Sequence, residues 1–229
     1  PGWDAWCAAL RGDTPVPAAQ PKPSLLSANE RRRASDSVLL AVDVAEQAVR
    51  ASGRDASLLA SVFTSAHGDL PITDALCTQL AQAPLQLSPT RFHHSVHNAA
   101  SGYWAIAAGC RSPSTAVSAH LHSFAAGLLE ALVHCACEHE PVLLVGYATE
   151  ALGLPADVNT SRGLLSVALV LSPERGDVCL GTLHWQLEDG DAAPPPLRSA
   201  TARAQQSNAM SDALPLFESL VLDEAQALA

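Results

Sequence analysis

The sequence has 229 residues, of which 48% are hydrophobic and 16% are charged, so the chain can bury a sizeable core and is not intrinsically disordered. Its formal net charge of −10 argues against binding to nucleic acid or to an anionic membrane surface, because like charges repel. The longest apolar runs are well short of the ~20 residues that a membrane span requires. The six cysteines are scattered among apolar residues, which indicates reduced, mostly buried thiols in a cytoplasmic protein.

The first half of the chain predicts helices that alternate with a buried strand. Residues 14–28 are rich in Pro, Ala and Ser and indicate a loop, whereas residues 29–53 carry apolar side chains at helical spacing. Residues 58–64 are apolar and partly β-branched, which favours a buried strand. A second helix is predicted over residues 73–83, and residues 84–96 form a predicted loop with two prolines.

The second half continues the same alternation. Residues 98–108 predict a helix of small residues that ends at Gly109, and a short strand follows at 113–118. An Ala-rich helix is predicted over 124–138, and a strong apolar strand over 141–147.

Two further strands are predicted at 164–171 and 178–187, joined as a hairpin by the turn at 173–176. Helices that alternate with strands predict an α/β domain. The strands are apolar on both faces, so we expect helices on both faces of a central sheet. Residues 188–212 are rich in Pro, Gln and Ser and predict a linker, and residues 214–229 predict an amphipathic helix.

The order of these segments resembles the N-terminal half of a β-ketoacyl synthase. The similarity covers roughly residues 25–187 and implies a thiolase-like fold with a mixed central sheet covered by helices on both faces. It divides the chain into a ketosynthase-like part, 1–187, and a linker with a C-terminal helix, 188–229. Five segments carry the resemblance: ERRRASDSVLLAVDVAEQAVRASG, ASVFTSAHGDL, NAASGYWAIAAGCRSP, EPVLLVGYATEA and GLLSVALVLSPERGDVCLGTLHWQL.

The resemblance also locates the position where the family carries its nucleophilic cysteine. The family cysteine follows the proline of a Gly-Pro pair by eight residues, and the same count from Pro113 ends at Leu121. If the alignment is shifted by one residue, the position falls on His120 or His122, and neither is a cysteine. In ketosynthases two further histidines and a lysine come from a C-terminal half, which we expect this chain to lack. The resemblance therefore implies a catalytically inactive homologue.

Elementary chemistry leads to the same expectation and leaves one catalytic role open. A thiol at a helix N-terminus has a lowered pKa because the helix dipole favours its anion, and Leu121 cannot use this effect. Ser123 is a possible nucleophile, but a serine needs an adjacent base, which His120 or His122 would have to supply. An acyl-transfer enzyme that uses these residues is thus a second functional class.

Truncated ketosynthase-like subunits occur in gene clusters for aryl polyene and xanthomonadin-type pigments, and this sequence is similar to that group. The resemblance implies a heterodimer with a full-length ketosynthase, an acyl carrier protein as second partner, no cofactor, and a role like that of a chain length factor. The residues expected at the partner's acyl tunnel or interface are Phe92, His93, His94, Val96, His97, Asn98, Tyr103, Trp104, Thr115 and Val117.

Metal binding and self-association also remain open at this point. Zinc could be bound by His93 and His97, which share a helical face, or within residues 134–140, which hold two cysteines and two histidines; we expect neither site to bind metal. A self-associating protein that binds acyl carriers is the third functional class. The sequence shows no nucleotide-binding loop and no dinucleotide fingerprint.

Overall fold

The computed structural model describes residues 2–12, 20–157, 159, 161–189 and 193–222. Within these ranges a four-stranded sheet has the order β2-β1-β3-β4. Strands β1, β2 and β3 are parallel, and β4 pairs antiparallel with β3, so the sheet is mixed. The strands are β1 (Ala60–Thr64), β2 (Ser114–Val117), β3 (Val142–Ala148) and β4 (Leu165–Leu171).

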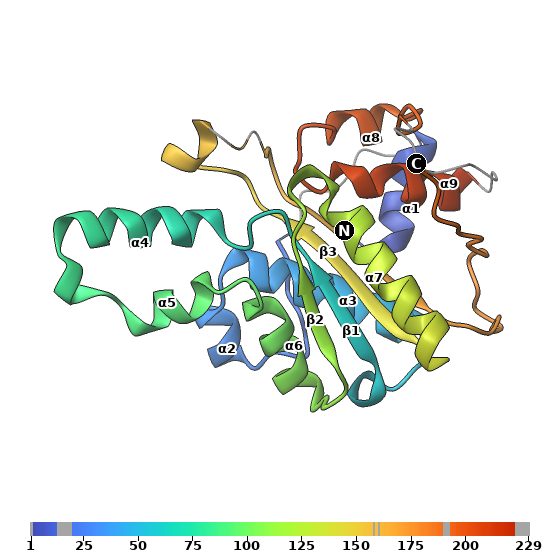
Figure 1. The fold of residues 1–229 in the computed structure, drawn as a ribbon, viewed down its shortest axis with the longest axis horizontal. Helices are drawn as coiled ribbons and strands as arrows, with labels where there is room; N and C mark the ends of the chain where they lie inside the picture. Colours follow the sequence, from blue (N-terminus) through green and yellow to red (C-terminus); the bar gives the residue numbers. More distant parts are fainter. Residues whose placement is uncertain (1, 13–19, 158, 160, 190–192, 223–229) are drawn as a thin grey trace.

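Helices cover both faces of this sheet, as predicted (Figure 1). Helices α3 and α6 pack on one face, and α7 packs on the other. No helix in the described ranges is both long enough and apolar enough to cross a membrane. The helices are α1 (Trp3–Arg11), α2 (Ala28–Arg33), α3 (Asp36–Ser52), α4 (Leu70–Gln82), α5 (Pro89–Ser95), α6 (Ala99–Ala108), α7 (Ser123–Glu138), α8 (Ala200–Ala204) and α9 (Leu214–Leu222).

Strand β3 divides the core into two clusters because its side chains alternate between the faces. Leu143 and Val145 belong to the cluster under α3 and α6, whereas Val142 and Leu144 belong to the cluster under α7. All seven residues of β3 are buried, which explains why the sequence shows an apolar run there instead of an alternating pattern.

The predicted strands at 58–64, 113–118, 141–147 and 164–171 are confirmed as β1 to β4, with ends that move by up to two residues. The predicted helix over residues 29–53 is divided into α2 and α3, because Ala34 has an extended backbone. A capping box formed by Ser27 and Glu30 starts α2, and Gly53, with φ +67°, ends α3.

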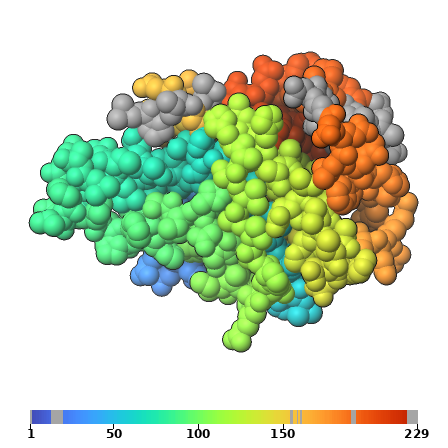
Figure 2. Space-filling view, viewed as in Figure 1, coloured from blue at the N-terminus to red at the C-terminus, as the bar shows by residue number. Residues whose placement is uncertain are grey.

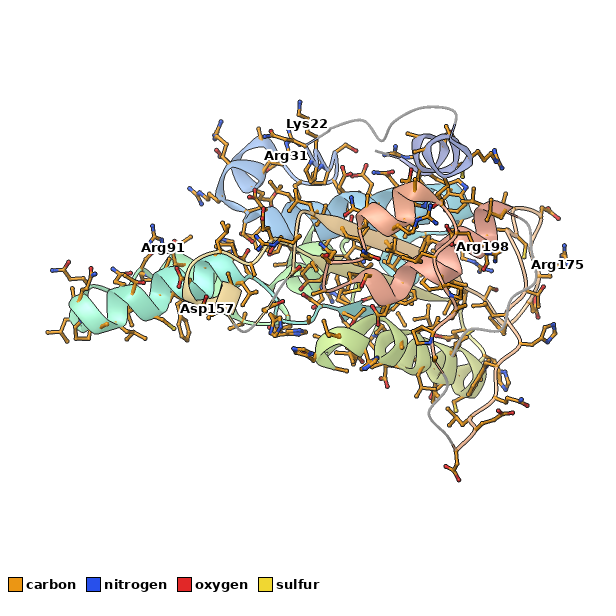
Figure 3. All side chains as sticks on the ribbon, turned by 90° about the horizontal axis from the view of Figure 1, so that it is seen from above. Lys22, Arg31, Arg91, Asp157, Arg175 and Arg198 are labelled. Atoms are coloured by element: carbon orange, nitrogen blue, oxygen red, sulfur yellow. The ribbon has the colours of Figure 1, made fainter. Side chains whose placement is uncertain are left out.

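The prediction of a loop over residues 84–96 is wrong, since it contains α5. Ser88 caps this helix by accepting from the Arg91 amide, and Pro89 occupies its first turn, where a missing N–H costs nothing. Helices α4 and α5 form an arm, residues 70–95, that projects from the sheet (Figures 1 and 2). Figure 3 shows Arg91 on this arm and Arg175 at the opposite end of the molecule.

The second strand of the predicted hairpin, 178–187, is also absent. This segment forms no ladder with β4, and Val178, Leu180 and Leu187 are exposed. An apolar run becomes a strand only where a neighbouring strand accepts its hydrogen bonds, and this segment pairs with no strand of the described sheet. The segment and β4 together line a groove of about 2360 Å³.

The segment predicted as a linker, 188–212, contains α8 and the short 3₁₀ turn η5 (Ser211–Ala213). Met210, Ala213 and Leu214 are fully buried in the cluster under α7, and the predicted terminal helix is confirmed over 214–222. Residues 223–229, and residues 14–19 of the predicted loop, lie outside the described residues. The functional division at residue 187 stays a prediction, although the chain beyond it contributes to the same core.

Candidate functional site

The site predicted from the sequence lies in the β2–α7 turn, residues 118–123. A 3₁₀ turn, His120–His122, connects the end of β2 to the start of α7. His120 has φ +53°, and His139 is the other non-glycine residue with positive φ in the described ranges. A left-handed backbone is strained for a side chain of this size. A sharp strand–turn–helix with such strain is the geometry that presents a nucleophile in other folds.

The exposed side chains of this turn offer no thiol. His120, Leu121 and His122 are exposed, with Leu121 at 49%. The cysteines nearest in sequence are Cys110, whose thiol donates to the Leu59 carbonyl at the start of β1, and Cys135, which lies in the second half of α7. Burial raises the pKa of Cys135. Neither cysteine can replace a nucleophile at the turn.

Ser123 is part of the scaffold of the turn. Its side chain is fully buried, and its hydroxyl donates to the His120 carbonyl at 2.6 Å and accepts from the Ala119 amide at 3.0 Å. The Thr64 hydroxyl in β1 donates to the Ser123 carbonyl at 2.5 Å. Among the described residues no imidazole nitrogen accepts the Ser123 proton, whereas a serine nucleophile requires such a base.

Three histidines from different segments meet beside this turn. The rings of His67, after β1, and His120 are edge to face with centroids 5.5 Å apart. Nε2 of His97 lies 2.9 Å from the Ser65 carbonyl, so this nitrogen carries the proton. Burial, and then the charges of His120 and His97, lower the pKa of His67. These surroundings therefore favour the neutral form of the His67 imidazole, at the carboxyl end of β1.

The predicted tunnel segment contains exposed and buried side chains. Phe92, His93, Val96 and Asn98 are exposed, and His97 is half-buried. The ring of His94 is 4% exposed and stacks on Tyr103 with centroids 5.5 Å apart. Burial, followed by the charge of His93, lowers the pKa of His94.

Trp104, which the resemblance placed at the partner, is 1% exposed and packs in the chain's own core cluster with Phe63 and Val145. Its side chain can affect a partner only through the residues that cover it. Strand β2 is at the outer edge of the sheet, with Thr115 exposed and Val117 half-buried. An outer strand presents unpaired N–H and C=O groups, which is what an interface strand requires.

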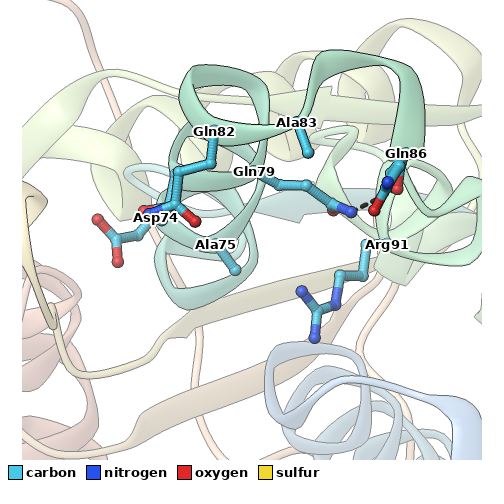
Figure 4. Close-up of a pocket in the computed structure, with 8 residues that line it drawn as sticks. Asp74, Ala75, Gln79, Gln82, Ala83, Gln86 and Arg91 are labelled. Carbon is cyan, nitrogen blue, oxygen red and sulfur yellow. Dashed lines mark hydrogen bonds between the residues drawn. The ribbon is translucent and has the colours of Figure 1, made fainter.

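The two zinc sites considered from the sequence find no support. Within the described residues no three His, Cys, Asp or Glu side chains are arranged to hold a metal ion. A separate polar pocket of about 510 Å³ lies between α4 and α5, and Figure 4 shows Arg91 beside it. Gln79 donates to the Gln86 carbonyl across the same loop. This pocket belongs to the arm and shares no residue with the β2–α7 turn.

One residue of the site was missed in the sequence. Asp212 in η5 accepts a hydrogen bond from the Ala125 amide at the start of α7, at 3.1 Å. Burial raises the pKa of Asp212 to about 6, although hydrogen bonds from the Ala125 and Phe124 amides and the charge of His122 oppose the shift. Asp212 belongs to a segment that resembled a polar linker, and no local pattern distinguishes it from the other acidic residues there.

Comparison with known proteins identifies the protein family. Residues 3–227 match the model of the β-ketoacyl synthase N-terminal domain, and the chain belongs to this family. It is 33% identical to a chain of the complex between the ketosynthase ApeO and its chain length factor ApeC from Xenorhabdus doucetiae, with a TM-score of 0.62. That match covers 76% of this chain and 72% of the other. A comparison with curated proteins finds no match.

More distant structures share the fold. The ishigamide ketosynthase/chain length factor is 17% identical, with a TM-score of 0.55, over 76% of this chain and 59% of that one. A β-ketoacyl synthase from Burkholderia phymatum STM815 is 14% identical, with a TM-score of 0.51, over 64% of this chain and 38% of that one. The described domain is therefore a ketosynthase-like domain related to complexes of ketosynthases with chain length factors.

Proposed function

We propose that this chain is a noncatalytic ketosynthase-like subunit that pairs with a full β-ketoacyl-acyl-carrier-protein synthase and helps to shape its acyl tunnel, as a chain length factor does. The observation that carries the proposal is the β2–α7 turn. It has the strained strand-to-helix geometry of a nucleophile site, but the exposed side chains of its 3₁₀ part are two imidazoles and the apolar Leu121. Ser118, at the end of β2, is also exposed, and its hydroxyl donates to the Ala66 carbonyl at 2.8 Å. The single hydroxyl at the start of the helix, that of Ser123, is held by two backbone hydrogen bonds.

The surface beside this turn supports a protein partner. The open edge of β2, with Ser114 and Thr115 exposed, can extend the sheet into a second subunit. Phe92, on the arm, is 61% exposed, and Val96, between the arm and α6, is 41% exposed. Apolar side chains of this size are commonly covered in complexes. The 33% identity with a chain of a ketosynthase–chain length factor complex supports a partner of the same kind. An acyl carrier protein is the proposed second partner, since ketosynthases receive their substrates from it.

The first experiment is co-expression with a full ketosynthase from the same genome, followed by size-exclusion chromatography and product analysis. We expect a 1:1 complex, and elongation to long acyl chains only when both proteins are present. A ketosynthase that elongates fully alone, without a complex, would contradict the proposal. Acylation of the isolated chain would favour an enzyme that uses Ser123, His120 or His122, and a stable homodimer would favour a self-associating carrier-binding protein.

The tunnel role has its own test. In the complex, Val96→Trp should shorten the acyl products, because added bulk at a closely packed wall leaves less room for the chain. Val133→Trp is the matched control, since Val133 has a similar exposure, 39%, on the outer surface of α7. Unchanged product lengths for Val96→Trp and Asn98→Trp would overturn the tunnel role while leaving the partnership in place.

A further inference from the structure

The amino end of α7 receives its negative charge from a distant segment. A helix start has unpaired N–H groups and the positive end of the helix dipole, so it attracts an anion. The N-cap residue of α7, His122, makes no side-chain cap, and the first turn has no acidic residue. Instead the carboxylate of Asp212, 87 residues after Ala125, accepts from the Ala125 amide.

The core holds Asp212 in this position. Its neighbours Met210 and Ala213 are fully buried. The Met210 amide donates to Oδ1 of Asn208 at 2.9 Å, and the Asn208 amide group donates to the Arg162 carbonyl at 2.9 Å. The η5 turn is thus attached both to the cluster under α7 and to the segment before β4. The carboxylate cannot leave the helix start without disturbing these contacts.

The carboxylate is itself only partly satisfied. Oδ2 accepts from the Ala125 amide, whereas Oδ1 is buried and has no hydrogen-bond partner among the described residues. An asparagine would accept the same hydrogen bond without bringing a charge out of water. The negative charge is therefore the feature that distinguishes this residue from an ordinary cap.

We propose that Asp212 is a positioning residue that fills the anion-binding place at the amino end of α7 and so withholds it from a thiolate or oxyanion at the β2–α7 turn. The inference rests on the proposed noncatalytic role and deepens it. A ketosynthase thiolate needs a positive electrostatic environment. A helix N-terminus that already holds a carboxylate repels a thiolate placed beside it. The turn thus lacks both the nucleophile and the electrostatic field that would activate one. Restoring a cysteine alone should give an ordinary thiol.

The test introduces a thiol at the N-cap of α7 by His122→Cys, in the full chain, with and without Asp212→Asn. The thiol pKa is measured from the pH dependence of alkylation by iodoacetamide. Each peptide is followed separately by mass spectrometry, because the six native cysteines also react. With Asp212 present we expect a pKa at or above the usual value of ~8.5. With the charge removed by Asp212→Asn we expect at least about a tenfold larger thiolate fraction at pH 7.

Asp36→Asn is the matched control, because Asp36 is exposed in the first turn of α3 and its replacement removes the same net charge. It should leave the alkylation profile unchanged. Equal thiol pKa values with and without Asp212→Asn would overturn the inference, as would a strongly lowered pKa while Asp212 is present.

A second thiol probe, Leu121→Cys, keeps the test valid if His122→Cys disturbs the turn, since Leu121 is half exposed. Complex formation with the ketosynthase is measured on the same variants. If the complex still forms but Asp212→Asn changes the pKa of neither thiol, this inference is overturned and the proposed function is not. Absence of a complex for the unchanged chain contradicts the proposed function.

Discussion

The two ends of α7 have the same backbone feature in different surroundings. His120, just before the helix, and His139, just after it, have φ values of +53° and +56°. His139 is the exposed C-cap residue, a position where a left-handed residue commonly ends a helix. His120 lies in a turn that Ser123 holds through its backbone and that faces His67. An unusual dihedral angle therefore indicates a site only when other segments converge on it.

The difference between the ends lies in how many segments build them. The amino end combines Thr64 of β1, the β2–α7 turn and Asp212 of η5, whereas the carboxyl end is formed by local residues with exposed side chains. We therefore expect substitutions at the amino end to cost more than matched substitutions at the carboxyl end.

The largest effect is expected at Gly127, where α7 packs against β1. A Cβ at this position would lie 2.8 Å from Cβ and Cγ2 of Thr64, which is buried and cannot move aside. Gly127→Ala should lower the free energy of unfolding by about 3 kcal/mol through overpacking. Ala136→Ser, at an exposed position of the carboxyl half, should change it by less than about 0.5 kcal/mol. Urea denaturation measures both, and equal values would contradict the comparison.

Asp212 should make stability depend on pH. Its folded pKa is raised from 3.8 to about 6, so the folded chain holds a proton that the unfolded chain releases, and stability is lost as pH rises through this window. The shift corresponds to roughly 3 kcal/mol. We expect Asp212→Asn to raise the free energy of unfolding by about 2 kcal/mol above pH 6. The gain is smaller than the full shift, because burying the asparagine amide also costs hydration.

This gain should become small below pH 4, where the carboxyl group is protonated in both states. Asp36→Asn is again the control, and its effect should be close to zero at every pH. Denaturation curves at pH 4, 5, 6 and 7.5 test the sign. A gain that is the same at all four values would show that the charge of Asp212 is not what costs stability.

Ser123→Ala tests whether the hydroxyl is structural. It leaves the Ala119 amide and the His120 carbonyl without their partner in a partly buried place, and we expect a loss of about 1 kcal/mol in the free energy of unfolding. Cys137→Ala, exposed near the other end of α7, should cost less than about 0.5 kcal/mol. Loss of acylation without loss of stability in Ser123→Ala would instead favour an acyl-transfer enzyme.

The smallest effect compares the two left-handed histidines directly. At His120 and at His139, glycine should be more stable than alanine by about 1 kcal/mol, because glycine has no Cβ to strain. Thermal denaturation of the four variants gives both differences. A much smaller difference at His120 would mean that the turn relaxes when its side chain is removed, and that its strain is not built into the backbone.

Local pattern predicted much of this fold. The strands at 58–64 and 141–147 and the helix at 124–138 follow from apolar runs and small residues, and each is present within one or two residues of its predicted ends. Helix α5 was missed because two prolines marked the segment as a loop, although one of them starts the helix. The strand predicted at 178–187 is absent, since strand formation depends on a partner that the local sequence does not reveal.

Local sequence is enough to predict the alternation of helices and strands, the family resemblance and the absence of a cysteine between Cys110 and Cys135. Three features become visible only when the chain is folded: Trp104 is a core residue, the Ser123 hydroxyl is hydrogen-bonded to the backbone, and Asp212 caps α7. Separation along the chain explains this difference. Helical and strand periods are local, whereas the charge at the start of α7 comes from a residue 87 positions away, which no local pattern connects to it.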